Sequence, residues 1–529
     1  MFQKWISEID QRKFRFGAIL PWLIIIYLAV TVTTAWVSDD AFITFRSIEN
    51  LVHGYGLVFN VGERVQTYTH PLWLLAQTLF YLPARLISTP FHLNRLFFTN
   101  VLLSLILSIA ALLVYTFKVA RSSKSAVIGL LALILSKSFI DYSTSGLENP
   151  LNHLLLIGFV GLFLNSDPEN RKRMVVLALL AGLAMLNRLD VFLLVFPPLG
   201  VLWWQSKAKL RTGGAFMIGL LPVILWEIFS LFYYGFLFPN TAYAKLNNHI
   251  RAVVLLKQGF YYFLNSFRLD PITLTLIAIA ILAAVLTRNK RFLSLATGLA
   301  LYLAYILYIG GDFMSGRYFS LPLMIAIVML SRLEYSNTRF AFSVLIVLAL
   351  GALPFLWGIE RRPTYGDNRE NNLVFLDEHK VADERLIYAE RTGLLAAMQG
   401  NSPKVVYMDE SWEYADSPTR TVEVFGALGI NAYRSGPNVH AIDRNGLADA
   451  LMARMPLIDT EDWRIGHFHH RVPDGYIETL EQRANLITDT RIAYYYEKLS
   501  VVIKDPLWNW ERLREIWYFN SGRYDTLIQ

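Results

Sequence analysis

The sequence contains no cysteine and few charged residues, and each deficit excludes something. Without cysteine, its 529 residues can form no disulfide, thiolate metal site or cysteine nucleophile. Charged residues make up only 17% of the chain, and hydrophobic residues make up 54%, whereas a soluble domain carries about 25% charged residues. The charge deficit lies in residues 1–358, and residues 359–529 have ordinary charge density. The composition therefore predicts a membrane block followed by a globular C-terminal domain.

Long apolar runs fill the first of these regions. About 20 apolar residues are needed to cross a bilayer core. The first run is longer than a signal-peptide core and is followed by no small-residue cleavage site, so we expect a retained helix. We predict a polytopic α-helical membrane protein with about eleven transmembrane helices, at residues 16–37, 96–117, 125–140, 147–164, 174–187, 190–204, 213–234, 271–287, 292–310, 317–332 and 339–358.

Clusters of Lys and Arg indicate how these helices are oriented. They precede the first predicted span and follow the second, fourth, sixth and eighth, at Arg12–Arg15, Lys118–Lys124, Arg171–Arg173, Lys207–Arg211 and Arg288–Arg291. Such clusters mark cytoplasmic loops. The positive excess, a net charge of +7, lies in these clusters, so membrane topology explains it better than nucleic-acid binding does. Counting the apolar residues 71–89 as a span would place the later clusters outside. We therefore predict an interfacial helix there, in a first outer loop at 38–95, and an extracytoplasmic domain at 359–529.

Acidic residues near membrane level collect on the predicted outer side. They are Asp39, Asp40, Asp141, Glu148, Asp190 and Asp312. A single loop Asp most often caps a helix, and the first two could cap a helix beginning at Ala41. Arg188 and Asp190 could form a structural ion pair in a tight turn. The sequence favours this equally with a role of Arg188 in binding a donor phosphate. Six carboxylates on one face, with basic residues beside them, nevertheless indicate a functional site.

These residue types suit glycosyl transfer from a lipid-linked donor. A carboxylate can take the proton from an acceptor hydroxyl, or attack the sugar carbon itself. A cation must neutralise the departing phosphate, and Arg matches its oxygens best. At the outer interface, a lipid-anchored donor could reach such a site while its chain stays in hydrocarbon.

Several motifs resemble the GT-C glycosyltransferases. Asp39–Arg46 (DDAFITFR), His53–Val65 and Thr69–Trp73 resemble the first extracytoplasmic loop of that superfamily. The set as a whole is most similar to the terminal β-(1→2)-arabinofuranosyltransferase family. Further matches to that family occur at Phe238–Lys245, Gly310–Arg317, Gly436–Val439 and Trp463–Phe468.

The resemblance implies a GT-C fold in the bacterial cytoplasmic membrane, with a polyprenyl-phosphate sugar donor and a cell-envelope glycan or glycoconjugate acceptor. The implied sugar is arabinofuranose. In GT-C enzymes an acid of the first outer loop is the catalytic base, a role that carries over to Asp39 or Asp40, and a second loop acid matches Glu148. We expect Asp39 to be the base, with Asp40 orienting the sugar or taking over that role. Arg317 and Lys245 are expected to hold the donor phosphate. No cofactor or metal is expected. The predicted substrate-binding residues are Arg46, His70, Glu148, Arg188, Lys245, Asp312 and Arg317.

Alternatives remain for the substrate and for the class of protein. Another lipid-linked sugar, such as mannose or aminoarabinose, would need the same residue types. A transporter would need charges at mid-helix and paired interrupted repeats. The predicted spans are almost free of acidic residues away from their ends, with Glu227 as an exception. The sequence therefore favours an enzyme.

The C-terminal domain is predicted to be a mixed α/β cap that helps to choose the acceptor. Short strands are expected at Val405–Met408 and Val422–Phe425. The tryptophans near the C-terminus could stack on sugar rings, or pack within the domain or against the membrane surface. The cluster of His467, His469 and His470 near Asp474 could bind a metal, but alternation on a strand or loop is the favoured interpretation.

Overall fold

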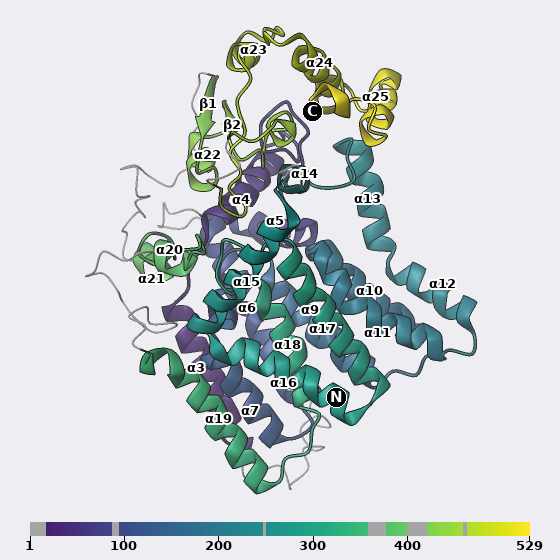
Figure 1. The fold of residues 1–529 in the computed structure, drawn as a ribbon, viewed down its shortest axis with the longest axis vertical. Coiled ribbons are helices and arrows are strands. Elements are labelled where there is room, and N and C mark those ends of the chain that lie inside the picture. The colour runs from purple at the N-terminus through teal and green to yellow at the C-terminus, as the bar shows by residue number, and fades with distance from the viewer. Residues whose placement is uncertain are drawn as a thin grey trace. The chain divides into compact units, whose positions relative to one another are not determined.

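The computed structural model describes residues 17–86, 95–246, 250–357, 377–398, 420–458 and 463–528, and helices dominate them (Figure 1). The chain forms two compact units. The first, here called the helical unit, comprises residues 1–37, 100–221 and 255–399. The second, the mixed unit, comprises residues 38–99, 222–254 and 400–529. This division crosses the boundary predicted at residue 358.

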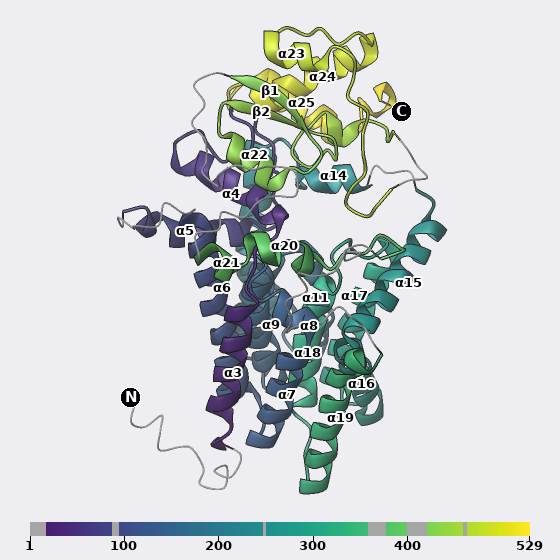
Figure 2. The same ribbon diagram turned by 90° about the vertical axis from the view of Figure 1, so that its left-hand side faces the viewer.

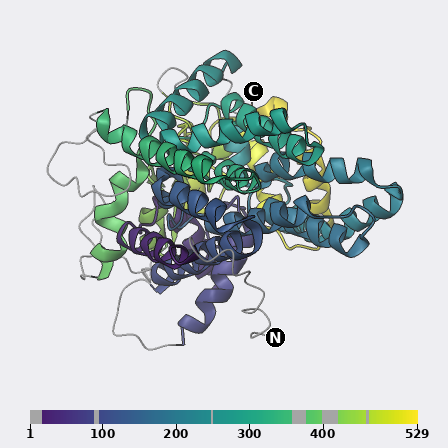
Figure 3. The ribbon, with the colours of Figure 1, turned by 90° about the horizontal axis from the view of Figure 1, so that it is seen from below.

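The helical unit contains most of the apolar helices. Their bounds are α3 Leu20–Thr33, α6 Arg95–Val114, α7 Ser123–Leu135, α8 Lys137–Asp141, α9 Asn149–Leu164, α10 Arg171–Asn187, α11 Phe192–Gln205, α12 Lys209–Gly219, α15 Ala252–Leu269, α16 Pro271–Thr287, α17 Lys290–Tyr308, α18 Ser320–Leu330, α19 Asn337–Leu356, α20 Glu384–Thr392 and α21 Leu394–Met398. Helices α3, α7, α16, α18 and α19 run along one another (Figure 2). Seen from below, α19 and α7 lie side by side (Figure 3).

Glycines allow close helix packing in this unit. A Cβ on Gly259 of α15 would lie 2.3 Å from the Leu307 carbonyl oxygen of α17. A Cβ on Gly298 of α17 would lie 2.8 Å from the Leu194 carbonyl oxygen of α11. Both glycines therefore permit backbone-to-backbone contact, as small residues do between membrane helices.

All eleven predicted spans coincide with helices, but the predicted number of crossings is not confirmed. Within the described ranges, three helices are long and apolar enough to cross a membrane: Arg95–Val119, α17 and α19. Two pairs bent at a short break, α12 with α13 (Leu221–Tyr233) by 53° and α15 with α16 by 110°, raise the number to five. The remaining apolar helices, such as α3 and α7, have 10–17 residues. Helix α15 was not predicted, because polar residues such as Lys257, Gln258 and Asn265 interrupt its apolar pattern.

The mixed unit contains one parallel pair of strands among its described residues. β1 (Thr421–Phe425) pairs with β2 (Val439–Asp443), and α22 (Gly429–Ser435) connects them. The strand predicted at Val422–Phe425 is therefore confirmed, whereas Val405–Met408 lies outside the described residues. The other helices of the unit are α4 Asp39–Val52, α5 Pro71–Ala84, α13 Leu221–Tyr233, α14 Asn240–Leu246, α23 Tyr476–Gln482, α24 Thr490–Lys504 and α25 Trp510–Asn520.

Apolar burial explains why the first outer loop joins the C-terminal residues. Ile43 and Phe59 of the loop pack in one core with Phe425 and Val439 of the strands. The side-chain amide of Asn60 donates to the Ala441 carbonyl and accepts from the Ala441 N–H, each at 3.0 Å, which continues the hydrogen bonding of β2. The loop therefore supplies part of the core of the mixed unit.

Candidate functional site

Asp39 and Asp40, the predicted catalytic pair, are the first two residues of α4. The carboxylate of Asp39 accepts hydrogen bonds from the backbone N–H groups of Gly429, at 3.0 Å, and Ile430, at 2.8 Å. A Cβ on residue 429 would lie 1.9 Å from the Asp39 carbonyl oxygen, so only glycine allows this approach. Asp39 is thus bound to the start of α22.

The pKa of Asp39 reflects opposing influences. Loss of hydration raises it to about 6, and the neighbouring charge of Asp40 acts in the same direction. The hydrogen bonds from Ile430 and Gly429 stabilise the carboxylate form and lower the pKa. Asp39 therefore titrates close to neutral pH.

The face of α4 that carries Asp39 packs against the C-terminal part of the mixed unit. Arg46, two turns further along this face, is fully buried. Its guanidinium donates to the carbonyls of Phe59 at 2.9 Å and Val439 at 2.6 Å, and also to that of Ala432. These contacts give Arg46 a structural role, and they offer no support for the substrate-binding role predicted for it.

Asp40 lies on a different face, because successive helical residues are about 100° apart. Four residues on, Thr44 shares that face, and its hydroxyl lies 2.8 Å from Nε2 of His70. Ser47 follows, with its hydroxyl 3.4 Å from that of Thr67. Asp39 and Asp40 therefore lie on two faces of α4 that contact different residues. His70 contacts the face that carries Asp40.

Lys245 and His467 occupy another part of the mixed unit. Lys245 is exposed near the end of α14. Burial lowers the pKa of His467 to about 3, and the charges of Arg464 and Lys245 add to this effect. Lys245 thus lies within electrostatic reach of a neutral histidine.

In the helical unit, four predicted residues come together in one ion cluster. Glu148, just before α9, lies 3.4 Å from Arg188 and 3.5 Å from Arg317. Arg317 also lies 3.5 Å from Asp312. Arg188 forms a two-pronged pair with Asp190, at 2.8 and 3.0 Å. The Arg188 guanidinium stacks on the Tyr318 ring at 4.1 Å.

Among the described residues, the ion pairs of this cluster join two guanidinium groups to three carboxylates, and all five side chains are nearly buried. The Arg188–Asp190 pair in a turn, which the sequence left open, is present. The pairs to Glu148 are long compared with the 2.7–2.9 Å of a strong charge-assisted hydrogen bond.

Comparison with known proteins decides the class. No family model matches the chain. A protein of Corynebacterium glutamicum named terminal β-(1→2)-arabinofuranosyltransferase is 27% identical over 519 aligned residues, covering 82% of this chain and 73% of the relative. A protein of Mycobacterium tuberculosis with the same name is 25% identical over 541 residues, covering 84% and 82%. The chain is a homologue of the terminal β-(1→2)-arabinofuranosyltransferases. It is therefore a glycosyltransferase.

Two solved structures resemble the fold of this arabinofuranosyltransferase homologue. The apo oligosaccharyltransferase of Archaeoglobus fulgidus is 13% identical with a TM-score of 0.46, covering 96% of this chain and 73% of that one. ArnT of Cupriavidus metallidurans, bound to undecaprenyl phosphate, is 12% identical with a TM-score of 0.42, covering 83% and 77%. The assignment rests on the two sequence relatives, since both scores are below 0.5.

The glycosyltransferase contains a second buried ion cluster that sequence analysis missed. Lys137 of α8 pairs with Asp141 and lies 3.1 Å from Asp383, and Arg385 lies 2.7 Å from Asp141. Asp141, grouped by sequence with the outer acids, is therefore part of a structural network that holds residues 377–398 to the helical unit. Lys137 could have indicated this cluster from the sequence, because a charged residue near the end of an apolar helix needs a partner of opposite charge.

Asp443 is a further acid that the sequence did not single out. It ends β2, and its carboxylate accepts hydrogen bonds from the N–H groups of Asn445, Leu447 and Ala448. Burial raises its pKa to about 6, and the charge of Asp40 contributes to the rise. The sequence Asp-Arg-Asn-Gly at 443–446 could have drawn attention to Asp443, but by itself it indicates only a turn.

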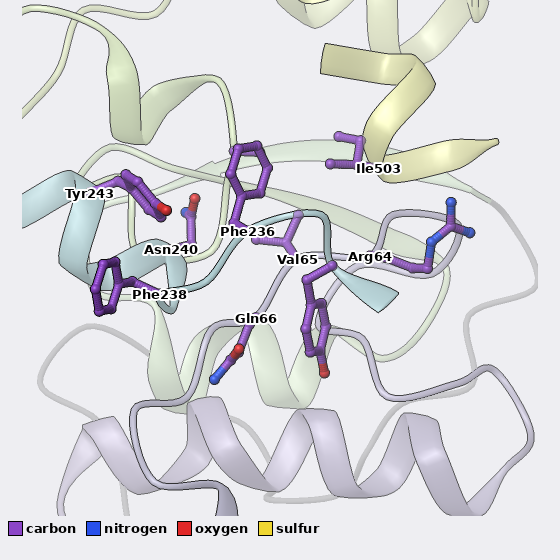
Figure 4. Close-up of a pocket in the computed structure, with 10 residues that line it drawn as sticks. Arg64, Val65, Gln66, Phe236, Phe238, Asn240, Tyr243 and Ile503 are labelled. Atoms are coloured by element: carbon purple, nitrogen blue, oxygen red, sulfur yellow. The ribbon is translucent and has the colours of Figure 1, made fainter. Parts of the chain in front are cut away.

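A small pocket lies within the mixed unit (Figure 4). Its polar lining includes Arg64, Gln66 and Asn240. Its volume is about 10 Å³, which is about the room that one water molecule needs. Asn240 donates to the carbonyls of Gly446 at 2.7 Å and Asp449 at 3.0 Å. The Phe238–Lys245 motif thus positions the turn after β2, and the pocket is too small for a sugar.

The histidines near residue 470 form no metal site with other residues that the structure describes. In the part of the chain that the structure describes, no three His, Cys, Asp or Glu side chains are placed to hold a metal ion. His470 is buried, with Nδ1 2.6 Å from the Met455 carbonyl oxygen. Backbone contacts therefore account for its burial.

Proposed function

We propose that the chain transfers arabinofuranose from a polyprenyl-phosphate donor to a cell-envelope glycan, on the extracytoplasmic side of the bacterial cytoplasmic membrane. The observation that carries this proposal is the similarity, over more than four fifths of the chain, to two proteins named terminal β-(1→2)-arabinofuranosyltransferase. The acid pair in the motif resembling a GT-C first outer loop supports it. So do the apolar helices and the predicted topology.

We assign the base role to Asp40. The two carboxylate oxygens of Asp39 already accept backbone hydrogen bonds that bind α4 to α22. Asp40 lies on the face that carries Thr44 and, through it, His70. Its carboxylate would take the proton of the acceptor hydroxyl as the new C–O bond forms and the bond to the donor phosphate breaks. The polyprenyl phosphate leaves with the electron pair, and the sugar carbon inverts.

Arg188 and Arg317 are the proposed donor-phosphate ligands. Their long contacts to Glu148 leave both guanidinium groups able to exchange that carboxylate for phosphate oxygens. Lys245, predicted for the same role, is exposed at α14 and is the second candidate. Glu148 would then reduce the repulsion between the two guanidinium groups when no donor is bound.

A donor panel tests this function. Purified protein in lipid nanodiscs would receive polyprenyl phosphates carrying arabinofuranose, mannose or aminoarabinose, with an oligosaccharide acceptor. We expect transfer from the arabinofuranose donor only, with inversion at the anomeric carbon. Transfer from mannose or aminoarabinose instead would replace the sugar assignment. Transfer with retention would replace the base role by a carboxylate nucleophile.

A further inference from the structure

Three tryptophans of the mixed unit are unusually exposed. The side chains of Trp508, Trp510 and Trp517 are 82%, 84% and 70% exposed. Trp510 and Trp517 are seven residues apart in α25 and share one face of it. Tryptophan is highly buried on average, so packing within the domain does not explain these three. They are referred to here as the tryptophan face.

The opposite side of α25 is fixed to the end of α13. Arg512 is fully buried, and its guanidinium donates to the carbonyls of Phe232 and Tyr233, each at 2.9 Å. Its Nε donates to the Val502 carbonyl of α24 at 2.8 Å. Ile516 packs in the core of the unit with Val502. The helix is therefore rigidly placed where α13 ends, as Figure 1 also shows.

An apolar stripe on α13 leads to the tryptophan face. Leu221, Leu225 and Ile228 are exposed and follow one another at helical spacing. The next member of this stripe, Phe232, contacts the ring of Trp508 with centroids 4.8 Å apart. Helix α13 is half of a bent helix pair that passes the test for a membrane span. The exposed lipid-compatible surface thus continues from a candidate span onto the tryptophans.

We propose that the tryptophan face is a membrane-interface anchor of the mixed unit, seated among the lipid headgroups where α13 leaves the hydrocarbon. Tryptophan prefers this zone because its ring is apolar and its indole N–H is polar. A glycan platform would explain exposed rings, but it would not explain their continuity with an aliphatic stripe. The anchor is independent of the proposed reaction.

The charges on this face make the expected contact insensitive to lipid charge. Arg514 lies between the two α25 tryptophans and pairs with Glu511 at 3.2 Å and Glu515 at 3.1 Å. The face therefore carries no excess of positive charge. Its attraction to the membrane comes from ring burial, and anionic lipid is not required.

The absence of cysteine allows a direct test. Single Trp517→Cys and Ser521→Cys variants of the full chain would carry a polarity-sensitive fluorophore in phosphatidylcholine nanodiscs. Ser521 is exposed one turn beyond Trp517, and that variant keeps all three tryptophans. Glu481→Cys, exposed on α23, is the matched control. The emission of labels at 517 and 521 should shift to shorter wavelength, should be quenched by a lipid-attached quencher and should resist quenching by aqueous iodide. The label at 481 should show no such shift and should be quenched by iodide but not by the lipid quencher.

Three outcomes would overturn the anchor. Iodide could quench positions 517 and 521 as fully as position 481, with no effect of the lipid quencher. The blue shift could require anionic lipid, which would make charge rather than tryptophan burial the cause. A soluble arabino-oligosaccharide could shift the label in detergent while the lipid quencher has no effect in nanodiscs, which would assign the face to glycan.

Discussion

Two sets of buried carboxylates, one in each unit, are stabilised in different ways. In the helical unit, Glu148, Asp190 and Asp312 face guanidinium groups, and Asp141 and Asp383 share Lys137. In the mixed unit, Asp39 and Asp443 are held mainly by backbone N–H groups. A cationic partner holds a carboxylate to another side chain, whereas backbone N–H groups hold it to a segment of the main chain. These acids of the helical unit therefore hold side chains together, whereas Asp39 and Asp443 hold a helix end and a turn.

The largest expected effect separates the two aspartates of α4. Asp40→Asn should lower turnover by about 10²–10⁴-fold, because an amide cannot accept the acceptor's proton. Thermal stability should change less than in Asp39→Asn, because the carboxylate of Asp39 accepts the backbone hydrogen bonds from the start of α22. Single-turnover transfer with excess donor measures the chemical step, and Asn at position 39 is the matched control. Undiminished turnover of the Asp40→Asn protein would end the base assignment.

The next effect concerns the helical unit. Arg188→Leu removes one partner of a buried network. It leaves Asp190 without its guanidinium partner and Glu148 with Arg317 alone, which should cost about 3–5 kcal/mol of unfolding free energy. Thermal melting in one detergent would show it. The exposed Arg121, paired with Glu334 on the surface, supplies the control variant Arg121→Leu, which should cost about 0–1 kcal/mol. Equal losses in the two variants would show that the cluster is no more important than a surface pair.

A smaller loss of stability is expected from Asp39→Asn. The amide nitrogen of Asn cannot accept from a backbone N–H, so either Gly429 or Ile430 loses its partner, at a cost of about 1–3 kcal/mol. Donor affinity should survive. Protease cleavage near residues 429–430 should rise while the helical unit stays resistant. A variant with wild-type protease resistance and no turnover would move the base role to Asp39.

The smallest effect is a pH dependence confined to the mixed unit. Burial raises the pKa of Asp39 and Asp443 to about 6 and that of Asp449 to about 7. Because these folded values exceed the ordinary 3.8, the native state binds more protons, and stability falls as pH rises from about 4 to about 7. Asp449→Asn should make this decline less steep, because an amide does not titrate. Melting curves at pH 4, 5.5 and 7 test this, and an unchanged slope would refute it.

Sequence located the helices well because apolar runs are a local signal. It also placed the acid pair at the start of α4. It could not separate Asp39 from Asp40, because that distinction depends on α22, which lies 390 residues further along the chain. Arg46 shows the same limit: basic residues in a loop suggest a ligand site, and only the carbonyls of Ala432 and Val439 reveal a structural role. Helix α15 was lost because its polar side chains meet partners within the fold, such as the Gln258 amide, which donates to the His379 carbonyl.

The contacts of Arg46 also have a consequence for biosynthesis. Its carbonyl acceptor at Ala432 lies 386 residues downstream. At about 5–20 residues per second, a ribosome needs roughly 20–80 s to reach that acceptor after making α4. During that interval the first loop has emerged without its core partners Phe425 and Val439. The nascent chain therefore carries an unfinished, charged loop through most of its translation, and the mixed unit is completed only when synthesis is nearly over.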